Sequence, residues 1–328
     1  MTNPEPQEPT PLVIDTDTGS DDAVALLLAA ASGLGRIVAV TTVAGNVPVA
    51  QATRNALYTL ELAGAGDVPV YQGSHQPLVR PPHTAQGVHG HDGMGDSALQ
   101  APTSAPRPDH AVDALARLAH PGVTLVTLGP LTNIAAALAR ERSLLARFRH
   151  VYCMAGAADG VGNISPTAEF NVWADPEAAA MVLAAAQPEQ VTWIGWDVSR
   201  RDAVMAPADQ LALRSLGTPL ATFADRINQT VNEWSLAVTG LAGYDLPDPI
   251  AMAIALRPAL IARTEQVHVR VALGDEARGQ LLIDRRRTAP SPNITLVRNA
   301  DATAFKSLLF DTLATPVPHA LPTGSASA

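Results

Sequence analysis

The chain has 328 residues, of which 47% are hydrophobic, and its formal net charge is −9 at pH 7. This length and apolar content are enough for a large buried core. An acidic chain without a cluster of basic residues is not expected to bind nucleic acid or an anionic membrane surface. No uninterrupted apolar stretch is long enough to cross a bilayer. The single cysteine, Cys153, excludes a disulfide within the chain and fits a reducing compartment.

The two ends of the sequence are predicted to be disordered tails, over residues 1–10 and 315–328. The first is acidic and rich in proline, and the second consists largely of proline, serine and alanine. An acidic start is unlike a signal peptide, so we expect a cytoplasmic protein. No linker or internal repeat interrupts the sequence between the tails, which predicts a single α/β domain over residues 11–314.

Apolar, β-branched runs alternate with alanine- and leucine-rich segments up to about residue 196. The runs are LVID, RIVAVTTVAG, VPVY, VTLVTLG, HVYCMAG and QVTWIGW, and the helical segments lie at 22–31, 49–63, 109–120, 131–140 and 176–186. Continuous apolar strands that alternate with helices are typical of a parallel sheet covered on both faces. We therefore predict an α/β fold, with a mostly parallel central sheet flanked by helices and a Rossmann-like core.

After about residue 197 the sequence becomes mostly helical, up to about residue 257. Three more strand-like runs follow, QVHVRVAL, GQLLID and ITLVRN, before a closing helix at 301–313. In open α/β sheets, ligands bind at the carboxyl ends of the strands. Polar segments directly follow several predicted strands: DTDTGSDD, Asn46 in TTVAGN, LGPLTN, and the stretch from MAGAADG to AEFN. This recurrence predicts one composite site built from several strand ends.

Four aspartates, Asp15, Asp17, Asp21 and Asp22, lie within eight residues where the first strand gives way to the first helix. Capping of that helix would account for Asp21 and Asp22 but not for the other two. Carboxylates this close together repel one another and raise one another's pKa unless a cation lies among them. Because every donor is an oxygen, the sequence predicts a hard cation, Ca²⁺ or Mg²⁺.

Two other aspartate-rich motifs do not match this sequence, because the chain lacks residues that their chemistry requires. The D-x-D-x-T motif of aspartyl-phosphate phosphatases needs threonine where this chain has Gly19. An EF-hand loop that began at Asp15 would need glycine and glutamate where Ser20 and Leu26 stand.

The stretch DTDTGSDDA resembles the signature of the inosine–uridine-preferring nucleoside hydrolases. The motifs TTVAGN, VHGHDGMG, LGPLTN, GN with AEFN, DPEAA and PDPIAMA follow in that family's order, over roughly residues 11–257. Each short motif is weak by itself, whereas the ordered set is specific. The resemblance implies a mostly parallel α/β sheet and Ca²⁺-dependent hydrolysis of the N-glycosidic bond of ribonucleosides, which yields ribose and a free nucleobase.

The resemblance also implies a role for individual residues. One Ca²⁺ would be bound by Asp17, Asp22, Asp248 and the backbone carbonyl of Leu128, and Asp17 would also be the general base that deprotonates the attacking water. The implied substrate contacts are Asp21, Asn46, Asn163, Glu169 and Asn171 for the ribose, Met154 and Phe170 for the wall of the sugar pocket, and His89 for the nucleobase. Outside these motifs, Asn163 and Asn171 would be interpreted as turn residues.

One position departs from the family pattern. Well-known members have a histidine immediately before the residue that corresponds to Asp248, and it helps to protonate the departing base; this chain has Pro247. The nearest ionisable residues are Tyr244 and Asp245. Three explanations remain open: proton donation by another group such as Tyr244 or His89, stacking of the base on Trp234, or a substrate whose leaving group needs little help.

Four functions were weighed on this basis. The first is a Ca²⁺-dependent ribonucleoside hydrolase, and the second is a hydrolase of a different N-ribosyl compound. The third is a non-catalytic ribose- or nucleoside-binding protein, which would not require Asp17, and the fourth is a phosphatase, which Gly19 disfavours. We expect a small-molecule nucleoside as the substrate and a homodimer or homotetramer as the assembly, and leave the choice between purine and pyrimidine open.

Overall fold

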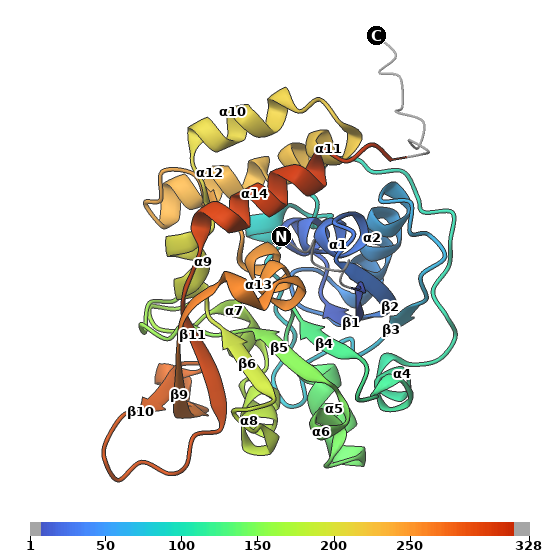
Figure 1. Cartoon of the computed structure of the whole chain (residues 1–328). Helices are drawn as coiled ribbons and strands as arrows, with labels where there is room; N and C mark the ends of the chain where they lie inside the picture. Colours follow the sequence, from blue (N-terminus) through green and yellow to red (C-terminus); the bar gives the residue numbers. More distant parts are fainter. Residues whose placement is uncertain (1–7, 318–328) are drawn as a thin grey trace, which may run out of the picture.

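A nine-stranded sheet forms the centre of the protein in the computed structural model, which describes residues 8–317 (Figure 1). Its strands are β1 (Thr10–Thr16), β2 (Gly35–Thr42), β3 (Val70–Gln72), β4 (Thr124–Thr127), β5 (His150–Met154), β6 (Val191–Ile194), β9 (Ile261–Val271), β10 (Leu281–Asp284) and β11 (Ile294–Ala300). Their order across the sheet is β10-β9-β11-β6-β5-β4-β1-β2-β3. Neighbours pair in parallel except β9, which runs antiparallel to both β10 and β11.

Helices cover both faces of this sheet (Figure 1). One face carries α1 (Ser20–Ala31), α2 (Val49–Leu62), α13 (Pro247–Leu256) and α14 (Ala302–Leu313); the other carries α4 (Ala111–Leu118), α5 (Thr132–Arg140), α6 (Leu144–Arg147) and α8 (Pro176–Ala185). The remaining elements are α3 (Gln86–His89), α7 (Phe170–Ala174), α9 (Trp196–Asp202), α10 (Pro207–Ser215), α11 (Pro219–Ile227), α12 (Gln229–Val238), the short strands β7 (Val204–Met205) and β8 (Tyr244–Asp245), and two 3₁₀ turns, Pro258–Leu260 and Asp275–Ala277.

The apolar run of β1 shows why these segments form a buried parallel strand. Successive side chains of a strand point to opposite faces of its sheet. Leu12 and Ile14 pack into the core on the side of α1 and α13, whereas Val13 packs into the core on the side of α5 and α8. All three are fully buried, so a strand covered on both faces needs apolar residues throughout. Within the described range, no helix is long and apolar enough to cross a membrane.

The predicted fold class is confirmed: the sheet is mostly parallel and flanked by helices. The mainly helical region after residue 197 is also present as α9 to α13, although it contains the two-residue strands β7 and β8, which the sequence did not indicate. The predicted N-terminal tail was one residue too long, because Thr10 already pairs with Gly35 and donates its N–H to the Leu34 carbonyl at 2.8 Å. The tail predictions for residues 1–7 and 318–328 concern parts of the chain outside the described residues.

The strand order places a ligand site at one particular point. Along β3-β2-β1-β4-β5-β6, the chain order reverses between β1 and β4. In open α/β sheets, a crevice opens outside the carboxyl ends of the strands at such a switch point. Here the end of β1 leads into Asp17 and α1, and the end of β4 leads into Leu128. The N-terminal aspartates therefore lie where the topology leaves room for a ligand.

Candidate active site

Asp15 lies within β1 and holds neighbouring elements together. Its Oδ1 accepts hydrogen bonds from Thr41 Oγ1 on β2 at 2.5 Å and from Asn133 Nδ2 on α5 at 2.8 Å. Burial raises the pKa of this carboxyl group to about 7, against the lowering effect of the two hydrogen bonds. Asp15 does not line the pocket described below, which indicates a supporting role.

Asp22 lies in the first turn of α1 and is held by three donors. Thr16 Oγ1 donates to its Oδ1 at 2.5 Å, while Gly19 N and Asn46 Nδ2 donate to its Oδ2 at 2.9 and 3.1 Å. The bond from Gly19 is the capping interaction expected at a helix N-terminus. Burial, followed by the charge of Asp21, raises the pKa of Asp22 to about 6. Asp22 thus caps α1 and is also buried next to other carboxylates.

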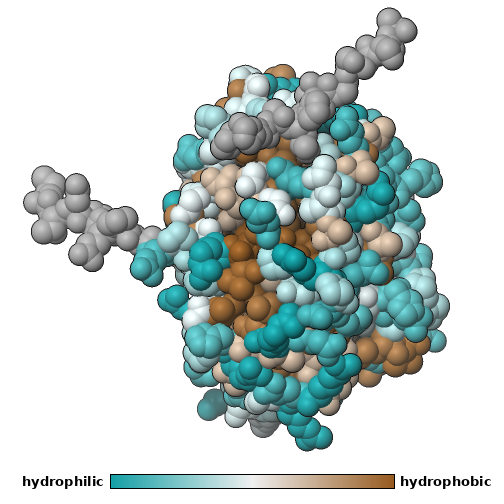
Figure 2. Space-filling model, turned by 90° about the vertical axis from the view of Figure 1, so that its right-hand side faces the viewer, coloured by the Kyte–Doolittle hydropathy of each residue, from teal (hydrophilic) through white to brown (hydrophobic). Residues whose placement is uncertain are grey.

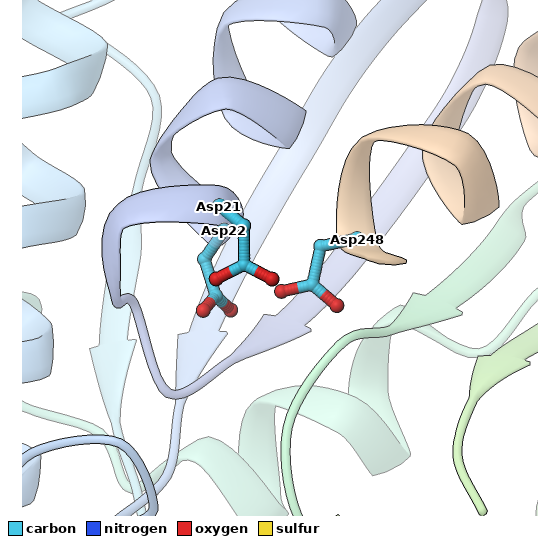
Figure 3. Close-up of side chains that lie close together, drawn as sticks. All are labelled: Asp21, Asp22 and Asp248. Carbon is cyan, nitrogen blue, oxygen red and sulfur yellow. The ribbon is translucent and has the colours of Figure 1, made fainter. Parts of the chain in front are cut away.

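Three carboxylates from opposite parts of the chain converge at this point. Asp21 and Asp22 extend from the start of α1 and Asp248 from the start of α13, and Figure 3 shows their carboxylates turned toward one another. Each has an oxygen within 4.8 Å of an oxygen of the other two. Burial, then the charges of Asp22 and Asp21, raise the pKa of Asp248 well above its usual range.

The donor chemistry of this cluster fits a bound cation. No lysine or arginine among residues 8–317 forms an ion pair with the three carboxylates; the nearest basic atom is His89 Nδ1, 3.8 Å from Asp21 Oδ1. Asp21 Oδ1 is buried, and none of residues 8–317 forms a hydrogen bond with it. Buried negative groups normally have a compensating charge or a metal. All the ligand atoms are oxygens, which suits a hard divalent ion.

Asp17, the predicted base, follows the end of β1 and is fully buried. Its Oδ2 accepts a hydrogen bond from Asn46 N at 2.6 Å, whereas its Oδ1 is buried and has no hydrogen-bond partner within the described part of the chain. Two glycines make room for it: a Cβ on Gly45 would overlap Oδ2, and a Cβ on Gly129 would lie 2.6 Å from Oδ1. Burial, then the charge of Asp22, raise the pKa of Asp17 well above its usual range.

A pocket of about 420 Å³ opens beside the carboxylates, a volume typical of small-molecule sites. The predicted site residues that line it are Asp21, Asn46, His89, Leu128, Met154, Asn163, Glu169, Phe170, Asn171 and Asp248. Asp17 and Asp22 do not line it, but both contact Asn46, which does. The structure thus brings the predicted residues together around one cavity.

Glu169 and Asn171 form an internally bonded wall of the pocket. Glu169 caps α7: its Oε1 accepts a hydrogen bond from Asn171 N at 2.7 Å, and its Oε2 accepts one from Gly156 N at 2.6 Å. Asn171 Nδ2 donates to the carbonyl oxygens of Leu128 and Met154 at 2.6 and 3.2 Å. Burial raises the pKa of Glu169 to about 7. These bonds fix the orientation of both side chains before any ligand arrives.

His89 reaches the pocket from the end of α3, and Asn163 reaches it from the loop between β5 and α7. His89 Nδ1 lies 2.9 Å from Ser20 Oγ, within hydrogen-bond distance. Burial lowers the pKa of His89 to about 4, so the ring is neutral near pH 7. Asn163 Oδ1 is buried and has no hydrogen-bond partner among the described residues. That carbonyl oxygen is therefore free to accept a hydrogen bond from a ligand.

The residues around Pro247, the position that departs from the family pattern, line two different cavities. Trp234, Asp245 and Pro247 line the pocket, whereas Tyr244 lines a different, smaller cavity and not this one. Trp196 also lines the pocket, although no motif in the sequence indicated it. It lies two residues after the end of β6, so the rule that sites form at strand ends is the signal that points to it.

This sheet, with carboxylates gathered at its switch point beside a ligand-sized pocket, defines an α/β enzyme with an acidic site suited to a cation. The model of the family described as "Inosine-uridine preferring nucleoside hydrolase" matches residues 12–307, and the chain belongs to that family. It is therefore an enzyme that hydrolyses N-glycosyl bonds of ribonucleosides.

Individual relatives match over almost their whole length. The pyrimidine-specific ribonucleoside hydrolase RihA of Photobacterium profundum is 37% identical over 309 residues, which are 93% of this chain and 98% of that protein. An uncharacterized protein of Schizosaccharomyces pombe is also 37% identical, over 92% of this chain and 98% of its own length.

Solved structures agree with this relationship. The plant nucleoside hydrolase PpNRh1 superimposes with a TM-score of 0.87 at 28% identity, over 94% of this chain and all of that one. A purine-preferring ribonucleoside hydrolase from Gardnerella vaginalis gives a TM-score of 0.85 at 27% identity, over 93% of this chain and 98% of that one.

Proposed function

We propose that this protein hydrolyses the N-glycosidic bond of ribonucleosides to ribose and a free nucleobase, and that it depends on a bound Ca²⁺. The observation that carries the proposal is the convergence of Asp21, Asp22 and Asp248 beside the pocket, where no lysine or arginine among residues 8–317 neutralises them. A ligand site for a neutral nucleoside would not need so much buried negative charge, because buried carboxylates are costly without a partner.

The residues that would hold the ion are Asp17, Asp22, Asp248 and the carbonyl of Leu128, with Asp21 adjacent to them. Carboxylate and carbonyl oxygens are the ligands that Ca²⁺ prefers. Such an ion, when bound, lowers the pKa of a water molecule and orients sugar hydroxyl groups. Gly45 and Gly129 support the assignment, because they leave the Asp17 carboxylate the space it occupies between two backbone segments.

Asp17 is proposed to accept the proton of the attacking water. Asn46 N holds its Oδ2, which leaves Oδ1 as the oxygen without a protein partner. A base needs such a free lone pair within reach of the proton that it removes. The negative groups around the site also favour the positive charge that develops on the ribosyl ring as the glycosidic bond breaks.

Asn46, Asn163, Glu169 and Asn171 are proposed to recognise the ribose. The existing hydrogen bonds hold the asparagine and glutamate groups of α7 in place, so little side-chain entropy is lost when a sugar binds. Met154 and Phe170 supply apolar surface on the same wall. A site built to bond hydroxyl groups discriminates strongly against a sugar that lacks them.

The proposal is tested by incubating the protein with inosine, uridine, cytidine and adenosine, with and without a chelator, and measuring released ribose. We expect release that stops with chelator and returns with added Ca²⁺. Asp17→Asn should lower kcat by at least about 10³-fold, as loss of a general base does. The matched control is Asp67→Asn, an exposed aspartate outside the pocket. Full activity in chelator would refute the role of the cation.

A second candidate substrate class is another N-ribosyl compound with a more easily released base. Pro247 lines the pocket at the position where a proton-donating histidine was expected, and proline has no ionisable side chain. The same assay extended to N-ribosides with charged leaving groups distinguishes the two candidates, because the preferred substrate has the highest kcat/KM.

We also propose a cytoplasmic homodimer or homotetramer. Figure 2 shows one face on which hydrophobic side chains gather near the middle, among mostly hydrophilic ones. An apolar area of this kind supports a subunit contact. Light scattering coupled to size-exclusion chromatography gives the mass in solution, and a mass of 34.1 kDa, that of one chain, would contradict the proposal.

A further inference from the structure

Tyr244 and Asp245, the two ionisable residues that precede Pro247, form the short strand β8 and line different cavities. Its two residues pair antiparallel with β7, Tyr244 opposite Met205 and Asp245 opposite Val204. Adjacent side chains of a strand point to opposite sides. Tyr244 accordingly lines the small cavity among α10, α11 and α12, and Asp245 lines the large pocket. Of the two neighbours, only Asp245 faces the substrate space.

Asp245 is held in place by Ser199, in the middle of α9. Ser199 Oγ donates to its Oδ2 at 2.6 Å, and Ser199 in turn is fully buried. Asp245 is 6% exposed, and it lines the pocket together with Trp196, Trp234 and Pro247. Burial raises its pKa to about 6, while the hydrogen bond from Ser199 lowers it. A carboxyl group in such a place retains its proton more readily than one in water.

The two histidines of the pocket are poorer candidates for a proton donor. His89 is neutral, and its Nδ1 already lies against Ser20 Oγ. His83 is exposed, and its ring packs edge-on against Trp173 at a centroid distance of 5.1 Å. The His83 ring is thus open to solvent and engaged with Trp173, unlike the buried side chain of Asp245.

We infer that Asp245 is the general acid that protonates the departing nucleobase. It would replace the histidine that well-known family members have at the position of Pro247. As the bond between C1′ and the base nitrogen breaks, its electron pair stays on the base, and the Asp245 carboxyl proton moves to that base. The water oxygen bonds to C1′ and passes its proton to Asp17. Solvent then returns one proton to Asp245 and removes one from Asp17. This inference rests on the proposed nucleoside hydrolysis.

The test compares substrates that differ in their need for an acid. Nucleosides release a basic nitrogen, whereas p-nitrophenyl β-D-ribofuranoside releases a phenolate that is stable without a proton. In Asp245→Asn we expect kcat for inosine and uridine to fall by about 10²- to 10⁴-fold, the usual contribution of general acid catalysis. We expect kcat for the p-nitrophenyl substrate to stay within about threefold, because its leaving group needs no acid.

Two further variants separate catalysis from structure. Tyr244→Phe, on the other side of β8, should leave both substrates unaffected. Ser199→Ala removes the donor that positions Asp245, so it should lower nucleoside turnover by a smaller factor and spare the p-nitrophenyl substrate. Thermal melts with Ca²⁺ present confirm that the variants are folded.

The outcomes distinguish this inference from the proposed function. Equal losses on both kinds of substrate in Asp245→Asn would mean a structural role and overturn the inference, as would unchanged nucleoside turnover. A nucleoside defect that appears in His83→Gln instead would assign the acid to His83. If the wild-type protein cleaves none of the ribosides, including the p-nitrophenyl one, the proposed function itself is wrong.

Discussion

At the scale of single residues, the position of the Asp17 carboxylate depends on two neighbouring glycines, which have no side chain. Gly45 and Gly129 stand on either side of its carboxylate, and neither could carry a side chain without displacing it. The motifs TTVAGN and LGPLTN contain these two glycines. Their place beside Asp17 follows from the packing of two strand ends, which sequence spacing alone does not reveal.

The substitution Gly45→Ala tests whether Asp17 needs the space that this glycine leaves. The added Cβ would overlap Asp17 Oδ2, so the carboxylate must move and the bond from Asn46 N is lost. We expect kcat to fall by at least about 10²-fold, because misplacement of a catalytic group by about 1 Å has effects of this size. Gly274→Ala is the control, since no atom lies within 4 Å of the Cβ it would add. Wild-type rates in Gly45→Ala would show that the position of Asp17 is not critical.

At the scale of elements, the start of α8 is tied to two other segments through its cap. Asp175 Oδ1 accepts the N–H of Ala178 at 3.0 Å, as an N-cap does, and its Oδ2 accepts from Thr132 Oγ1 at 2.7 Å and Leu78 N at 2.9 Å. The pair Asp175-Pro176 has the residue types typical of a cap followed by proline at the first helical position. The bonds to α5 and to the loop at Leu78 required the tertiary structure.

Asp175→Ala should therefore destabilise the fold more than an ordinary cap mutation. Loss of a cap costs about 1 kcal/mol, and Thr132 Oγ1, the buried donor left unpaired, adds about 1–3 kcal/mol. We expect the free energy of unfolding to fall by roughly 2–4 kcal/mol in urea titrations. The comparison is Asp301→Ala, an exposed cap of α14 that bonds only the N–H groups of Thr303 and Ala304, for which about 1 kcal/mol is expected. Equal losses would contradict the extra role of Asp175.

At the scale of the whole molecule, the buried carboxyl groups link stability to pH. Burial raises the pKa of Asp15 and Glu169 to about 7 and that of Asp22 to about 6, from reference values of 3.8 and 4.5. A group whose pKa is raised by folding favours the folded state at low pH, and this contribution is lost as the pH rises through the folded pKa. The protein without a cation should therefore become less stable between about pH 4 and pH 7.

Calcium should reverse this trend. A cation among ionised carboxylates binds more tightly once they have lost their protons. We expect added Ca²⁺ to raise the Tm more at pH 8 than at pH 5, with a stabilisation of about 2.7 kcal/mol when its concentration is 100 times its Kd. Differential scanning calorimetry with and without chelator measures both effects. A larger gain at pH 5, or none at either pH, would contradict a carboxylate cation site.

The sequence by itself determined the fold class, the positions of most strands and helices, and the family. Those properties follow from local periodicity and from motif order, which the letters record directly. The central strands β4, β5 and β6 are buried on both faces, and their continuous apolar pattern identified them as buried parallel strands. Short pieces such as β7 and β8 were not predicted, because two residues are too few to show a period.

Which distant residues come into contact depends on the tertiary structure. Asp248 lies 226 positions after Asp22, and only the packing of α13 beside α1 places their carboxylates within reach of one ion. The same holds for Tyr244 and Asp245, which are equivalent candidates in the sequence and are sent to opposite cavities by the pairing of β8 with β7. Contacts between distant segments are set by the free energy of burying whole faces against one another, and no local stretch of sequence contains that information.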